Sequence, residues 1–169
     1  REDKNIPDDE GVAGYDLDWN NKQTKVNKMR KVHQKIGNTV KTFLESIENG
    51  STKTDFKKVN RNTVIGLQRS SDLCRHPIET IHGIEWCVTI QYCHTDIVTV
   101  GITRNKTMYC YINTGGYTTK TTKEYINAAL SALGFPNHLR IRNYTMQLIG
   151  DDCEVVPDFY TSYLLAKQL

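Results

Sequence analysis

Asn113-Thr114-Gly115-Gly116-Tyr117-Thr118-Thr119-Lys120-Thr121-Thr122-Lys123-Glu124 is the stretch of this chain in which a strand gives way to a helix. The pair Gly115-Gly116 allows the backbone to turn sharply after the strand. Thr121 followed by Glu124 has the spacing of a capping box, which marks a helix N-terminus. The apolar positions that follow recur at helical spacing, and Gly134 stops the pattern. We therefore predict a helix over residues 122–133.

Alternating apolar residues predict strands on both sides of this helix. Upstream, strands are expected at 84–92, 96–103 and 107–113, with short hairpin connections and one buried face. Downstream, they are expected at 139–149 and 153–156, and residues 159–169 are expected to form a short docking helix. The resulting order is β-β-β-α-β-β. This order predicts an α+β domain in which an antiparallel sheet is covered by one helix.

Charge divides the chain into three parts. The net charge is +3, but the first 18 residues are acidic, residues 19–69 carry twelve basic side chains against three acidic ones, and the remainder is nearly neutral. We expect an acidic irregular tail at 1–20, a basic helical arm and linker at 21–82, and the β-rich α+β domain at 83–169.

A heptad pattern runs through the basic arm and predicts a helix over residues 22–48. Its apolar seam consists of Val26, Met29, His33, Ile36, Val40, Phe43 and Ile47. Two interpretations remain open. The seam packs on the core of the same chain, or its members other than His33 join copies of the chain into a homo-oligomer.

The composition disfavours several classes of protein. No apolar run reaches the roughly 18 to 20 residues that a membrane-spanning helix needs. The five cysteines form no CxxC pair, which argues against a disulfide framework and points to a reducing compartment. Three of them fall in predicted strands, where they are expected to pack as small hydrophobic side chains. Cys74, His76 and His82, like Cys93-His94, lack a second pair of zinc ligands. We therefore predict no membrane, metal or cofactor and no catalytic residue.

The stretch around the double glycine resembles a signature of an uncharacterised family of small tailed-bacteriophage proteins. In that signature a strand ends in Gly-Gly-aromatic and continues as Thr-x-Thr-Thr-Lys into a helix with Ile-Asn, here Ile126-Asn127. The resemblance covers about residues 87–156 and leaves the basic arm unmatched. Many relatives end in a Phe-Asp-Gly-Met-like stretch, whereas this chain has Pro157-Asp158-Phe159-Tyr160-Thr161. The resemblance implies a viral origin and the host cytoplasm, and it carries over no activity.

Three groups of residues are candidates for binding an anion. The first turn of the predicted helix offers backbone N–H groups beside Lys120, Lys123, Thr118 and Thr121, although the same stretch is also explained as a purely structural turn. Period-two spacing places Arg140, Arg142 and Tyr144 on one face of a strand, where they would hold a phosphate and stack on a base. The basic arm adds Lys28, Lys31 and Lys35.

These observations favour a phage-encoded intracellular accessory protein that binds nucleic acid or a host protein that handles nucleic acid. A first alternative is a virion or assembly component that uses the heptad helix for protein contacts. In that case the missing initiating methionine reflects cleavage during maturation. A second alternative is a nuclease whose metal is held by Asp151, Asp152 and Glu154, although these acids fall in a predicted turn.

Overall fold

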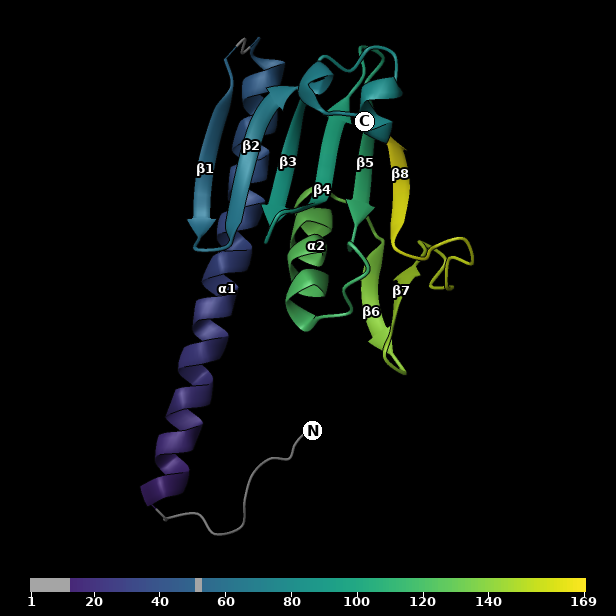
Figure 1. Cartoon of the computed structure of the whole chain (residues 1–169). Helices are drawn as coiled ribbons and strands as arrows, with labels where there is room; N and C mark the ends of the chain where they lie inside the picture. Colours follow the sequence, from purple (N-terminus) through teal and green to yellow (C-terminus); the bar gives the residue numbers. More distant parts are fainter. Residues whose placement is uncertain (1–12, 51–52) are drawn as a thin grey trace. The chain divides into compact units, whose positions relative to one another are not determined.

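The computed structural model describes residues 13–50 and 53–169 of an α+β protein, which confirms the predicted class (Figure 1). The chain divides into two compact units. The first extends to Val32, and the second comprises His33–Leu169. Helix α1 (Ala13–Glu48) begins in the first unit and continues into the second. The predicted irregular tail therefore lies outside the described residues up to residue 12, and its remainder is helical.

Six strands form one antiparallel sheet in the second unit. In spatial order they are β1 (Asp55–Asn60), β2 (Thr63–Arg69), β3 (Trp86–Tyr92), β4 (Thr95–Ile102), β5 (Thr107–Asn113) and β8 (Ser162–Gln168). Helix α2 (Lys120–Ala132) follows β5, and β6 (His138–Arg142) and β7 (Thr145–Ile149) form a separate hairpin. Two short 3-10 helices, η1 (Ser70–Asp72) and η2 (Pro77–Thr80), lie between β2 and β3. Strands β1 and β2 thus fall within the expected linker and belong to the sheet.

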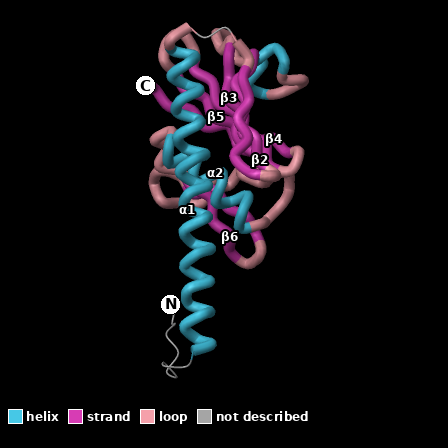
Figure 2. Tube along the Cα trace, turned by 90° about the vertical axis from the view of Figure 1, so that its left-hand side faces the viewer, coloured by secondary structure: helices cyan, strands magenta, loops and turns pink. Residues whose placement is uncertain are grey.

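One face of the sheet forms the main core with α2 and with the part of α1 that belongs to the second unit (Figure 2). The strand register places Ile65, Ile90, Val98 and Ile112 in one row across β2 to β5, and all four are fully buried. The helices contribute the buried side chains of Ile36, Val40, Phe43, Leu44, Ile126, Ala129 and Leu130. The helices approach closely at Gly37, where a Cβ would lie only 3.1 Å from the Cβ of Ala132.

The opposite face of the sheet is partly covered by residues 70–84, which contain η1 and η2. Leu73, Ile78 and Ile84 form an apolar cluster there with Cys87 of β3. As a result, every residue from Trp86 to Ile90 is buried. The prediction of a single buried face was wrong for β3, because a segment assigned to a linker supplies a second apolar layer.

The predicted strand over 139–149 is in fact the hairpin β6–β7. Its apolar residues change phase between Ile141 and Met146, which is the sign of an intervening turn, and Asn143 and Tyr144 form that turn with φ of +53° and +61°. A two-residue turn with positive φ at both positions matches the twist of the flanking strands. The next predicted strand, 153–156, is reduced to one isolated bridge between Ile149 and Val155.

The C-terminal segment is a strand instead of the predicted docking helix. β8 pairs with β5 from Thr107↔Gln168 to Asn113↔Ser162 and so covers the edge of the sheet that β5 would otherwise expose. Leu165 of β8 is buried. Pairing along the whole length of β5 satisfies its backbone groups, which a helix docked there could not do.

Two of the five cysteines behave as the strand pattern predicts. Cys87 and Cys110 are fully buried. Burial raises the pKa of each thiol to about 12, and the carboxylates of Asp96 and Asp72 add to the rise at Cys87. Cys153 also falls in a predicted strand but is exposed, so the prediction was wrong there. Cys74 and Cys93 are exposed as well, and all five cysteines are free thiols. Among the described residues, no helix is long and apolar enough to cross a membrane.

Candidate functional site

The chain leaves β5 through a compact turn that its own side chains hold. The Asn113 side-chain oxygen accepts a hydrogen bond from Gly115 N (2.9 Å), and the Thr114 hydroxyl accepts one from Gly116 N (3.2 Å). Gly115 and Gly116 have φ of +67° and +85°, values that residues with a Cβ rarely adopt. The sharp turn predicted from the double glycine is therefore confirmed.

Helix α2 is capped two residues earlier than predicted. Thr119 is the N-cap, and its hydroxyl accepts a hydrogen bond from Thr122 N (3.3 Å). The prediction that Thr121 caps the helix with Glu124 was wrong. Three threonines within four residues offer the same chemistry, and the turn at the double glycine places Thr119 at the helix entrance. The helix consequently begins at Lys120.

The first turns of α2 carry an acid as well as Lys120 and Lys123, the two lysines predicted to bind an anion. Lys120 is 72% exposed, and its Nζ lies 3.9 Å from a carboxylate oxygen of Glu124. The other oxygen of Glu124 lies 3.8 Å from His33 Nε2. Lys123 and Thr121 are half-buried, whereas the side chain of Thr118 is exposed. An anion at this turn would therefore meet a carboxylate beside its cations.

The β6–β7 hairpin presents a different arrangement of cations and an aromatic ring. Arg140 is half-buried, and its Nε donates to Gln147 Oε1 (2.8 Å) across the hairpin. Arg142 is exposed, and Tyr144 is 95% exposed. Because Tyr144 lies in the turn, the expectation that it shares a strand face with both arginines was wrong. The structure places Arg142 and Tyr144 together at the hairpin tip and leaves Arg140 on the strand.

The structure describes the side chains of some lysines of α1 and not of others. In the first unit Lys31 is exposed, and the side chain of Lys28 lies outside the described residues. In the second unit Lys35 is exposed, and its Nζ donates to the carbonyl oxygen of Val59 in β1 (3.4 Å). Lys41 is exposed as well. The helix thus presents cations to solvent on both sides of the unit boundary.

The heptad seam packs on the core of its own chain in the part that is described. Ile36, Val40 and Phe43 are buried, and Ile47 is half-buried. The side chains of Val26 and Met29 lie outside the described residues. The three buried residues are therefore occupied within the second unit, and contacts between copies would have to use the earlier part of the seam.

The structure contains two concavities that were not predicted from the sequence. One of about 240 Å³ lies beside the entrance of α2, and its lining includes Tyr92 and Tyr117. The other, of about 390 Å³, lies on the sheet face opposite the helices and includes Phe56 of β1 and Asp96 of β4. The smaller one is lined by the β3–β4 hairpin and by the segment that enters α2, and the larger one by β1 to β4 and the segment that follows β2. Both bring together segments that are separate in sequence, so no local sequence pattern predicts them. No family model, no curated protein and no solved structure matches this chain.

Proposed function

We propose that this protein binds single-stranded nucleic acid, with Tyr144 at the tip of the β6–β7 hairpin stacking on a base. The observation that carries the proposal is the conformation of Tyr144. Its φ is +61°, yet 95% of its side chain is exposed. Turns of this type favour glycine at that position, because a side chain in the left-handed region costs roughly 1 kcal/mol. The ring is almost fully exposed, so packing against the described residues does not offset that cost.

The surroundings of Tyr144 suit a phosphate backbone. Arg142 is exposed two residues away, and no acidic residue occurs between His138 and Ile149. An exposed aromatic ring beside a guanidinium group is the arrangement that binds single strands, since the ring stacks on a base and the cation neutralises the phosphate. Tyr117, which is 61% exposed, stands three residues before Lys120 and repeats the combination at the entrance of α2.

The proposal also includes a biological setting, namely a phage-infected host cell. The resemblance of the segment around Gly115-Gly116 to a bacteriophage family supports a phage-encoded accessory protein in the host cytoplasm. The protein either contacts nucleic acid directly or binds a host protein that handles nucleic acid. A pull-down from host lysate with and without nuclease separates the two, because a direct protein contact survives nuclease treatment.

Fluorescence anisotropy with a labelled 20-nucleotide single strand tests direct binding. We expect the affinity to fall steeply with salt, because binding releases counterions from the phosphates. Arg142→Gln should weaken binding at low salt and make the salt dependence shallower by about one phosphate contact. Lys106→Gln is the matched control, since Lys106 is exposed in the turn between β4 and β5. A salt-independent signal, or equal loss in both variants, contradicts the proposal.

A further inference from the structure

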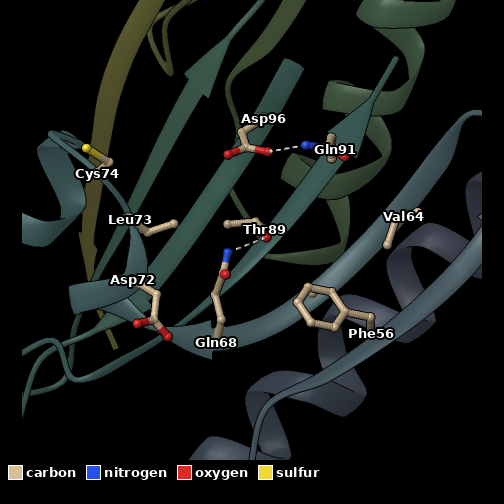
Figure 3. Close-up of a pocket in the computed structure, with 10 residues that line it drawn as sticks. Phe56, Val64, Gln68, Asp72, Leu73, Cys74, Thr89, Gln91 and Asp96 are labelled. Carbon is tan, nitrogen blue, oxygen red and sulfur yellow. Dashed lines mark hydrogen bonds between the residues drawn. The ribbon is translucent and has the colours of Figure 1, made fainter. Parts of the chain in front are cut away.

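The larger concavity lies on the sheet face that points away from α1 and α2. Phe56, Gln68, Thr89 and Gln91 border it from β1, β2 and β3, and Asp96 borders it from β4 (Figure 3). Asp72 and Cys74 close it from the segment that follows β2. Its volume of about 390 Å³ is large enough for a small organic group, whereas the neighbouring part of the same face is filled by the apolar cluster around Ile78.

The concavity is rich in hydrogen-bond acceptors. The amide nitrogen of Gln68 already donates to the Thr89 hydroxyl (3.1 Å), and that of Gln91 donates to Asp96 (3.4 Å). These contacts use one N–H of each amide and leave each amide oxygen available as an acceptor. Asp72 and Asp96 add two carboxylates, which accept hydrogen bonds and donate none when ionised.

The charge of the concavity opposes that of the chain. No lysine or arginine is among its lining residues, although the whole chain has a net charge of +3. Asp96 and Asp72 both raise the pKa of the buried Cys87 thiol, after the larger effect of burial, so both carboxylates act on the same part of the sheet. Lys58 lies beside Val64 on this face but is exposed outside the lining. An anionic ligand would be repelled here, and a cation would be attracted.

An aromatic ring borders the same space. Phe56 is 59% exposed, and its ring lies directly on the backbone of Gly66 in the neighbouring strand. A Cβ at position 66 would be only 2.7 Å from a ring atom, so glycine is required for this close approach. A flat cation gains from contact with such a ring through its quadrupole.

We propose that this concavity binds a guanidinium group, by means of the carboxylates of Asp72 and Asp96 and the ring of Phe56. A guanidinium is planar, permanently charged, and has five N–H donors and no acceptor, which complements a site of oxygens and one aromatic face. An ammonium group lacks the planar shape and the parallel donors. The site is independent of the hairpin tip to which nucleic-acid binding is assigned.

The reactivity of Cys74 reports on occupancy, because this exposed cysteine is one of the residues that line the concavity. The full chain is alkylated with iodoacetamide, and the rates at Cys74 and at Cys153 are followed by peptide mass spectrometry. Cys153 is exposed but lies outside the concavity, so it serves as an internal reference. We expect N-acetylarginine amide at millimolar concentration to slow Cys74 at least threefold relative to Cys153. N-acetylcitrulline amide, which has the same shape but no charge, should leave the ratio unchanged.

Variants and a second probe complete the test. Asp72→Asn and Asp96→Asn should each abolish the protection of Cys74, whereas Asp151→Asn, at an exposed acid in a distant turn, should retain it. Agmatine is the second probe. Stronger protection by agmatine points to a free small guanidine, and stronger protection by the arginine amide points to an arginine side chain of a polypeptide. Equal protection by citrulline, equal slowing of Cys153, or unchanged protection in both asparagine variants overturns the proposal.

Discussion

Several residues adopt left-handed backbone conformations, which cost free energy in any residue that has a Cβ. Gly115 and Gly116 adopt such conformations without strain, as the double glycine suggests. At Gly116 a Cβ would meet nothing within 4 Å, whereas at Gly115 it would lie 3.1 Å from the Thr95 methyl group. We expect Gly116→Ala to lower the free energy of unfolding by about 1 kcal/mol and Gly115→Ala to lower it by more. Urea denaturation measures both, and equal or smaller loss at Gly115 would contradict the geometry.

The thiols of the five cysteines provide a second test at the level of single residues. Because burial raises the pKa of Cys87 and Cys110 to about 12, almost no thiolate forms at these sites at pH 8 in the folded state. The other three cysteines are exposed. A disulfide reagent at pH 8 should therefore titrate three thiols rapidly in the native protein and all five after unfolding. Five rapidly reacting thiols in the native protein would show that the strands are not packed as described.

The elements are joined by specific polar contacts as well as by apolar packing. Asn127 of α2 binds β6 as a neighbouring strand would, since its amide nitrogen donates to Leu139 O (2.9 Å) and its side-chain oxygen accepts from Leu139 N (2.7 Å). Leu139 is buried, so Asn127→Ala would leave two backbone groups without partners. We expect this variant to lose about 2 to 4 kcal/mol of stability in urea denaturation. Asn49→Ala, at an exposed position after α1, should change stability by less than about 0.5 kcal/mol.

Local sequence patterns were sufficient for some elements and not for others. The strand β5 was predicted with its observed bounds, and the Gly134 stop after α2 is confirmed with φ of +79°. Strand β8 was missed because its position depends on the free edge of β5, which no local pattern reveals. The concavity around Phe56 and Asp96 was missed for the same reason, since its walls come from four strands and the η1 segment. Residues 113–124 and 140–144 could be chosen as candidates because their cations and aromatic rings are close in sequence.

The whole molecule combines an acidic N-terminal stretch, a basic helix and a sheet domain. The second unit contains the α1 residues that the structure describes as buried, together with the sheet, so removing residues 1–32 should leave a cooperatively folding chain. That removal deletes five basic residues of the arm, from Lys22 to Lys31. We expect weaker binding to a single strand and a shallower dependence on salt.

Removing only residues 1–18 is the matched control for this truncation. That stretch is acidic, so its loss should strengthen binding or leave it unchanged. Anisotropy titrations at several salt concentrations distinguish the two truncations. The contribution of the basic arm would be contradicted if both truncations changed the affinity in the same direction.

The replacement Tyr144→Gly tests the central claim most directly, because it should weaken binding without lowering stability. Glycine relieves the strain at φ +61°, so stability in urea should stay equal or rise by up to about 1 kcal/mol. Loss of the stacking ring should weaken binding to a single strand about fivefold or more. Tyr160→Gly serves as the control, since Tyr160 is 81% exposed beside the acidic Asp158. Unchanged affinity in Tyr144→Gly, with Tyr160→Gly equally unaffected, would contradict the account.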